Sequence, residues 1–177
     1  VALVAAASKG LGRAVATEFA REGARVAMCS REQGAIAEAA TAIAKATGSE
    51  THAVAADLST AQGCETFVRE ALGRFGGIDA LVVNAGGPPP GRFDDLDDAA
   101  WQKAVELTLF SAVRLTRLAL PERRKSKGSI AYMTSTSVRQ PTQYLNLILS
   151  NAIRAAVHGM LKTLSKESTL SSPYCLT

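Results

Sequence analysis

Short apolar runs alternate along the chain with longer segments in which apolar residues recur every three or four positions. The first run, residues 1–6, is followed by Leu11, Val15 and Phe19, which fall on one face of a helix. This strand-then-helix pattern recurs and predicts strands over residues 1–6, 25–29, 51–55, 80–83 and 129–134. Helices are predicted after residue 10, over 33–46, around 67–75, over 97–120 and around 153–164.

Alternating strands and helices are typical of a parallel sheet covered by helices on both faces, with right-handed crossovers. The expected fold class is therefore α/β, a doubly wound parallel sheet of the Rossmann type. A length of 177 residues predicts a single domain, 1–177. The tail 169–177 is weakly patterned, so we expect further strands to be missing after the last helix. Pro121 is expected to end the long helix 97–120, because a proline inside a helix removes a backbone hydrogen bond.

Composition narrows the functional classes. Hydrophobic residues make up 47% of the chain and charged residues 20%, which is ordinary for a folded globular protein. The longest apolar stretch, 107–120, is interrupted by Arg114 and Arg117, so no membrane-spanning helix is predicted. The net charge of +4 is mild, and the basic run 123–127 lacks interleaved aromatic residues, so no nucleic-acid partner is expected.

The cysteines and histidines are few and scattered. Cys29, Cys64 and Cys175 form an odd set without paired spacing, which favours reduced thiols and a cytoplasmic protein. His52 and His158 have no neighbours at metal-ligand spacing, so no metal site is expected.

A glycine-containing turn follows the first predicted strand. Here Gly10 and Gly12 would let the backbone approach a pyrophosphate at the start of the next helix. A turn of this type usually begins with glycine, whereas this chain has Ala6, which fits only if its φ angle stays negative. At the end of the second strand, Ser30 and Arg31 stand where a ribose-binding carboxylate is usual. A hydroxyl and a guanidinium favour a 2′-phosphate, and therefore NADP, with Lys9 as a second cation.

Further motifs then resemble one family. Asp57-Leu58 follows the third strand and Asn84-Ala85-Gly86-Gly87 the fourth, while Trp101 and the run 155–157 lie in the fourth and last helices. Over residues 1–167 the chain resembles the short-chain dehydrogenase/reductases, especially their 3-oxoacyl reductase branch. The resemblance implies hydride transfer between NADP(H) and a carbonyl or alcohol. The cofactor-binding residues expected are Ala6, Ser8, Lys9, Gly10, Leu11, Gly12, Ser30, Arg31, Asp57, Leu58, Asn84, Ala85, Gly86 and Arg154.

The catalytic set that the resemblance implies is largely replaced. The family's Asn, Tyr and Lys fall on Thr108, Ser150 and Arg154. The family's Ser falls on Ser135 when counted from the strand and on Ser137 when counted back from Ser150. We favour Ser135, because loop lengths vary more readily than strand registers.

A reductase must protonate the alkoxide formed by hydride transfer, and serine is a far weaker acid than tyrosine. Three replacements are considered: Tyr144 swinging into the site, Ser135 donating alone, or a water acting in the field of Arg154. Tyr144 ranks first because it is the phenol nearest in sequence. The candidate catalytic residues are thus Ser135, Arg154, Ser150 and Tyr144.

Two functions follow from this pattern. The first is an NADP(H)-dependent oxidoreductase acting on a small carbonyl or alcohol substrate. The second is an NADP(H)-binding protein with impaired turnover that serves as a sensor or assembly partner. The resemblance also implies a homodimer or homotetramer that pairs the long and last helices across subunits. The apolar residues expected at that interface are Leu107, Leu115, Leu118, Leu161 and Leu164.

Overall fold

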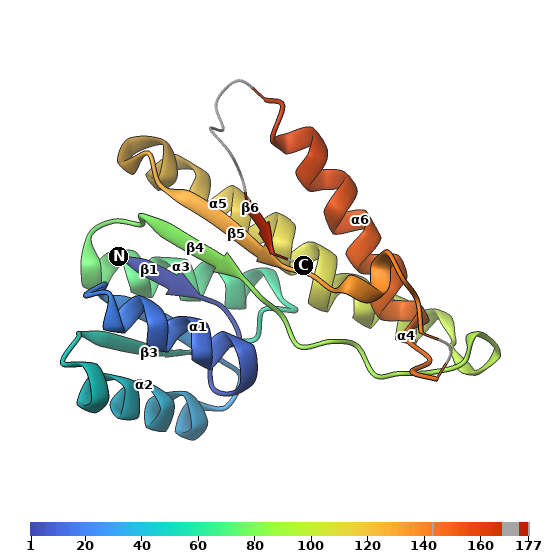
Figure 1. Cartoon of the computed structure of the whole chain (residues 1–177), viewed down its shortest axis with the longest axis horizontal. Coiled ribbons are helices and arrows are strands. Elements are labelled where there is room, and N and C mark those ends of the chain that lie inside the picture. Colours follow the sequence, from blue (N-terminus) through green and yellow to red (C-terminus); the bar gives the residue numbers. More distant parts are fainter. Residues whose placement is uncertain (143, 168–173, 177) are drawn as a thin grey trace.

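The computed structural model describes residues 1–142 and 144–167, together with the backbone of 174–176. Its centre is a six-stranded sheet with the order β3-β2-β1-β4-β5-β6, in which every neighbouring pair is parallel (Figure 1). The strands are β1 Ala2–Val4, β2 Val26–Ser30, β3 Thr51–Ala55, β4 Ala80–Val83, β5 Ser129–Met133 and β6 Tyr174–Leu176. After β1 the chain adds β2 and β3 on one side of that strand, and it then crosses to add β4 and β5 on the other side. The order of the strands therefore reverses beside β1, and this switch point forms a crevice at the carboxyl ends of the strands.

Helices cover both faces of this sheet, which confirms the doubly wound fold. They are α1 Gly10–Arg21, α2 Gln33–Thr47, α3 Ala61–Phe75, α4 Asp98–Ala104, α5 Ser111–Ser126 and α6 Ile148–Leu164. A π-helical segment, Val105–Phe110, joins α4 to α5. Apolar side chains of α1 and α2 pack on one face of the sheet, and those of α3, α5 and α6 pack on the other.

Strands β1, β2 and β4 are buried on both faces, which explains why they read as continuous apolar runs. Leu3 packs toward α3 and α5, whereas its neighbour Val4 packs toward α1 and α2, and both are fully buried. Cys29 and Cys64 are buried free thiols, and the side chain of Cys175 lies outside the described residues. Among the residues that the structure describes, no helix combines the length and apolar character needed to cross a membrane.

The prediction that Pro121 ends the long helix was wrong. The helix is divided into α4, the π-helical segment and α5, and α5 continues through Pro121 to Ser126. Pro121 is exposed, so the carbonyl that its missing N–H leaves unpaired can be hydrated. The helix ends instead at Ser126, and the next residue, Lys127, caps it with a φ of 54° in the left-handed region.

Two other expectations need correction. The tail contains β6, which pairs with β5 between Ala131 and Met133; residues 168–173 and 177 lie outside the described part. The interface residues Leu115 and Leu161 are buried within the subunit, 0% and 6% exposed, because α5 and α6 pack their apolar faces onto the sheet. These two leucines are therefore not available to a second subunit.

Candidate active site

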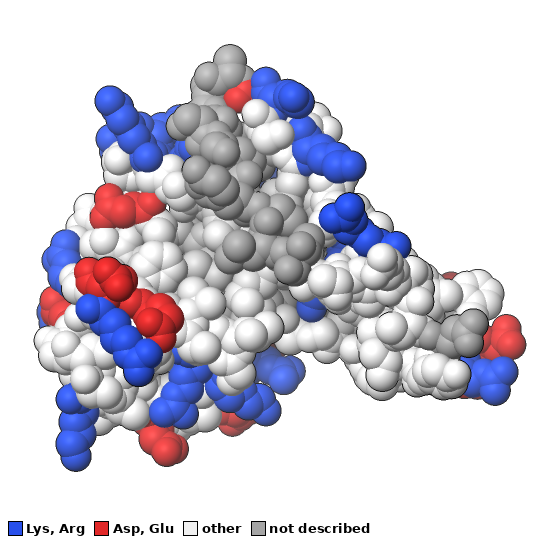
Figure 2. Space-filling model, viewed as in Figure 1, with Lys and Arg blue, Asp and Glu red and all other residues white. Residues whose placement is uncertain are grey.

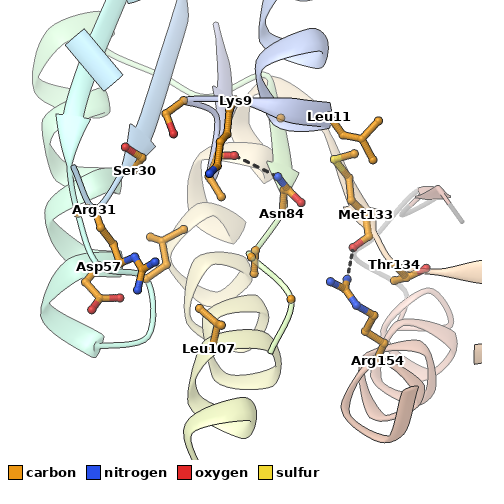
Figure 3. A pocket seen from close by; sticks show the side chains of 18 residues that line it. Lys9, Leu11, Ser30, Arg31, Asp57, Asn84, Leu107, Met133, Thr134 and Arg154 are labelled. Atoms are coloured by element: carbon orange, nitrogen blue, oxygen red, sulfur yellow. Dashed lines mark hydrogen bonds between the residues drawn. The ribbon is translucent and has the colours of Figure 1, made fainter. Parts of the chain in front are cut away.

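A groove of about 440 Å³ lies at the switch point, along the carboxyl ends of the strands. Figure 3 shows Arg31 and Asp57 at one end of it, Arg154 with Met133 and Thr134 at the other, and Lys9 and Asn84 between them. The lining residues are Ala6, Ser8, Lys9, Leu11, Gly12, Ser30, Arg31, Ala56, Asp57, Leu58, Asn84, Ala85, Gly86, Gly87, Leu107, Met133, Thr134 and Arg154. All the cofactor-binding residues expected from the sequence lie here except Gly10, which is the first residue of α1.

The turn between β1 and α1 is built differently from what we expected. Ala6 has a φ of +49°, in the left-handed region, so the condition that its φ stay negative is not met. An L-residue with a Cβ is strained by about 1–2 kcal/mol in that region. The turn also packs closely against the start of α1, because a Cβ on Gly12 would stand only 2.4 Å from the Ala6 carbonyl oxygen.

The first turn of α1 has backbone donors available for an anion. Lys9 is the N-cap residue, and its side chain makes no capping hydrogen bond. The N–H groups of the first helical turn have no partner within the helix, and the helix dipole adds positive potential there. With Lys9 beside them, these groups suit a phosphate.

Asn84 holds the turn from the neighbouring strand. It follows β4, and its Nδ2 donates to the carbonyl oxygen of Ala6 at 3.2 Å (Figure 3). The amide is half-buried at the floor of the groove. Its role in this structure is to fix the backbone that faces the groove.

The end of the groove beside β2 and β3 carries Ser30, Arg31 and Asp57. Arg31 is exposed and forms no hydrogen bond or ion pair with the residues that the structure describes, so its guanidinium is open to a ligand. Ser30 Oγ donates to the carbonyl of Glu32 at 3.2 Å. Asp57 Oδ1 accepts from the backbone N–H and hydroxyl of Ser59, which fixes the start of the loop after β3.

Arg154 forms the opposite wall. Its Nε donates to Ser150 Oγ at 3.2 Å, and Nη1 donates to the carbonyl oxygen of Met133 at 3.0 Å. Burial lowers the pKa of the guanidinium from its ordinary value. Even so, arginine stays protonated in proteins, so this wall of the groove keeps a positive charge.

Ser135 and Ser137 belong to one hydroxyl chain beside α6. Ser137 Oγ donates its one hydroxyl hydrogen to Asn151 Oδ1 at 2.6 Å. In the 2.7 Å hydrogen bond between the two serines, Ser135 is therefore the donor and Ser137 the acceptor. Neither serine lines the groove. The structure therefore leaves open which of them holds the family's position, and it adds Asn151, which the sequence analysis did not single out although it adjoins Ser150.

Tyr132 and Tyr144, the two tyrosines whose side chains the structure describes, do not line the groove. Tyr144 is 90% exposed and does not line it. It belongs to the loop before α6, in an arm that also includes the loop before α4, and Figure 2 shows this arm largely free of charged side chains except at its tip. Tyr132 is 1% exposed; Thr116 Oγ1 donates to the Ala112 carbonyl, so the Tyr132 hydroxyl donates to Thr116 at 2.6 Å. Burial raises the pKa of Tyr132, which keeps the phenol neutral.

Thr108 occupies the π-helical segment, at the position that the resemblance gives to the family's Asn. Its hydroxyl is buried and has no hydrogen-bond partner among the described residues. A small inner cavity of about 10 Å³ lies against it and is also lined by Thr134 and Arg154. Thr134, another residue that we had not selected, bonds His158 Nε2 through its hydroxyl at 2.8 Å.

The parallel sheet, the glycine turn and a groove at the switch point define the Rossmann class of nucleotide-binding folds. The model of the short-chain dehydrogenase family matches residues 1–171, and the chain belongs to this family. It is 30% identical over 168 residues to 11-beta-hydroxysteroid dehydrogenase A of Sesamum indicum, covering 94% of this chain and 48% of that protein. It is 31% identical to dehydrogenase/reductase SDR family member 4 of Oryctolagus cuniculus, covering 94% of this chain and 64% of that protein.

Solved structures agree with this placement. L-Sorbose reductase from Gluconobacter frateurii, complexed with NADPH and L-sorbose, matches with a TM-score of 0.88 and 34% identity, over 94% of this chain and 63% of that one. A 3-ketoacyl-ACP reductase from Sinorhizobium meliloti has a TM-score of 0.88 and 27% identity, over 94% of this chain and 66% of that one. The chain thus spans roughly half to two thirds of the length of the relatives it matches.

Proposed function

We propose that this chain is the cofactor-binding part of an NADP(H)-dependent oxidoreductase that interconverts a carbonyl compound and an alcohol. The observation that carries the proposal is the single groove running from Arg31, past the α1 N-terminus, to Arg154. Its donor set fits a dinucleotide with a 2′-phosphate. A carboxylate at the end of β2 would repel that phosphate, but this chain has Ser30 and Arg31 there, which can donate hydrogen bonds to it. Lys9 adds a second cation.

Each end of the groove has a separate task. The free N–H groups of α1 would bind the pyrophosphate, and Asp57 stands at the adenine end that the family resemblance implies. The bound cofactor supplies the hydride. Arg154 would stabilise the negative charge that develops on the substrate oxygen, because a fixed cation in a partly desolvated wall acts where charge appears.

The proton must come from another group than the family's tyrosine. In the described part of the chain no tyrosine side chain lines the groove. The buried hydroxyl of Thr108 faces an inner cavity close to the size of one water, and Arg154 lines the same cavity. Of the replacements considered from the sequence, a water in the field of Arg154 therefore fits the geometry better than Tyr144.

A binding titration tests the cofactor proposal. NADPH should bind the chain at least about tenfold more tightly than NADH, since a hydrogen bond to a charged group contributes about 1.5–3 kcal/mol. Arg31→Ala should remove most of that preference. Arg69→Ala, an exposed arginine on α3 outside the groove, serves as the matched control and should leave it unchanged. Equal binding of both nucleotides by the unmodified chain would contradict the NADP assignment.

A second function deserves a test, because no phenol lines the groove in the described residues. A protein that binds NADP(H) without turnover would act as a sensor or an assembly partner. The two functions separate in a screen of carbonyl compounds with saturating NADPH, followed by loss of absorbance at the nicotinamide band. Cofactor binding without oxidation across the screen would favour the binding protein.

We also propose that the chain forms a homodimer or homotetramer, as its family resemblance implies. Leu118, on α5, is half-buried. Phe110, the residue directly before α5, is 40% exposed, so this part of the chain retains apolar surface. Sedimentation at micromolar concentration should give a mass at least twice that of the chain. A monomer under those conditions would overturn the assembly.

A further inference from the structure

The charge of Arg154 has no counter-charge in the described structure. No carboxylate of the described residues forms an ion pair with it, and its two hydrogen bonds there go to the neutral oxygens of Ser150 and Met133. A guanidinium carries five N–H donors, so three of them, including both on Nη2, are left for a ligand. A partly buried cation without a partner anion is unfavourable, and an anionic ligand would relieve it.

The sequence around the groove reinforces this imbalance. No aspartate or glutamate occurs between Glu122 and Glu167, a stretch that includes β5, the serine chain and α6. None occurs between Asp79 and Asp94 either, which covers β4 and the glycine- and proline-rich loop after it. These two stretches, which supply β4, β5 and α6 around Arg154, therefore contain no acidic side chain that could reach it by a change of rotamer.

The remaining wall of the groove includes Leu107, on the π-helical segment. The acidic residue next to it in sequence, Glu106, already forms an ion pair. Its carboxylate pairs with Arg114 at 2.7 Å. The carboxylate that lines the groove itself is Asp57, at the opposite end from Arg154 (Figure 3). Lys9, Arg31 and the N-terminus of α1 would bind the phosphates of the cofactor. The ribose hydroxyls of the cofactor could accept hydrogen bonds from Arg154, but they carry no charge to balance its own.

From this arrangement we infer that the substrate carries a carboxylate, which Arg154 binds next to the carbonyl group that reacts. The inference rests on the proposed oxidoreductase function and names its substrate class: an oxo acid or hydroxy acid rather than a neutral ketone or thioester. The planar guanidinium matches a carboxylate with two parallel N–H donors. Gly87 keeps the approach open, since even an added Cβ there would remain 4.0 Å from Arg154 Nη2.

The test compares three small probes on the NADP⁺ complex of the full chain: acetoacetate, acetoacetamide and the neutral N-acetylcysteamine thioester of acetoacetate. Acetoacetate should bind at least about tenfold more tightly than either neutral probe, as expected for a charge-assisted pair. The ¹⁵N-detected Nε–Hε resonance of Arg154, assigned by its loss in Arg154→Lys, should shift with acetoacetate alone. Arg154→Gln should reduce the preference for acetoacetate to about onefold.

Lys162→Gln is the matched control, because this exposed cation lies on the same helix outside the groove and should leave the preference intact. Equal binding of the charged and neutral probes while NADP⁺ still binds would overturn the carboxylate inference and leave the proposed function standing. Loss of NADP⁺ binding in Arg154→Gln and Arg154→Lys would also overturn it, since the charge would then serve the cofactor. Failure of the unmodified chain to bind NADP⁺ would reject the proposed function itself.

Discussion

The side-chain amide of Asn84 donates a 3.2 Å hydrogen bond to the carbonyl oxygen of Ala6, 78 positions earlier in the chain. The bond joins the ends of β1 and β4, which are neighbours in the sheet. It holds Ala6 at a φ of +49°, a conformation that alanine rarely adopts. At the groove floor, a long-range contact thus coincides with a backbone conformation that the turn sequence does not favour.

Replacing Ala6 with glycine should stabilise the protein. The substitution removes a left-handed penalty of about 1–2 kcal/mol, partly offset by the greater freedom of glycine in the unfolded chain. A net gain of about 0.5–1 kcal/mol is expected in urea unfolding. Ala14→Gly, at an exposed position inside α1, is the control and should lose about 0.5–1 kcal/mol. If both variants lost stability equally, Ala6 would not be strained.

Gly12→Ala should do the reverse at the same turn. Its Cβ would stand 2.4 Å from the Ala6 carbonyl oxygen and 2.9 Å from Asn84 Nδ2, so the turn must shift. Overpacking of this kind costs about 1–3 kcal/mol, and NADPH binding should weaken with it. Gly73→Ala, within α3 and with open space around it, should instead gain about 0.5–1 kcal/mol. Thermal unfolding measures the stability of both variants, and a fluorescence titration measures their NADPH binding. Unchanged stability and binding in Gly12→Ala would contradict the close packing at this turn.

Much of the fold and of the groove could be predicted because local pattern and long-range structure agree there. Parallel strands such as β2 are buried on both faces and so read as apolar runs. Their carboxyl ends meet along one edge, which brings residues such as Arg31 and Arg154 into the same groove although they are far apart in sequence.

The failures have a common cause, since each depends on packing that the local pattern does not encode. Ala6 adopts a positive φ where Asn84 bonds its carbonyl and Gly12 allows α1 to approach closely, and neither relationship can be read from the residues next to Ala6. The π-helical segment carries the same apolar spacing as an ordinary helix, so its unpaired Thr108 hydroxyl gave no signal. Tyr144 is a different case: its ranking rested on nearness in sequence and stays a prediction, and in this structure its side chain is 90% exposed and does not line the groove.

Thr108→Val and Thr116→Val form a matched pair that tests the buried hydroxyls. Thr108 has no partner among the described residues, and the proposed function gives its hydroxyl a water in the inner cavity, so losing the hydroxyl should lower the unfolding free energy by about 0.5–1.5 kcal/mol. Thr116 accepts the hydrogen bond of Tyr132, so the same substitution there should lower it by about 1–3 kcal/mol. Chemical denaturation measures both. A gain of stability in Thr108→Val would mean that no water in the inner cavity satisfies its hydroxyl, which would contradict the water proposed as the proton donor.

Stability should fall as the pH rises above about 9. Burial raises the pKa of the Cys29 thiol from 9.0 to about 12 and that of Cys64 to about 11. The unfolded chain therefore releases these protons at lower pH than the folded chain, which favours unfolding over that interval. The stabilisation is complete below pH 9 and is lost as the pH rises toward 12 for Cys29. Each such group contributes a slope of up to about 1.4 kcal/mol per pH unit.

The variant Cys29→Ala isolates one of these groups. Its stability at neutral pH should drop because volume is lost from the core, but its decline above pH 9 should be shallower than in the unmodified protein. Urea unfolding under reducing conditions at a series of pH values from 7 to about 11 gives the two slopes. Tyr132, whose pKa burial also raises, remains in both proteins and cancels from the comparison. Identical slopes would mean that Cys29 ionises as readily in the folded chain as in the unfolded one.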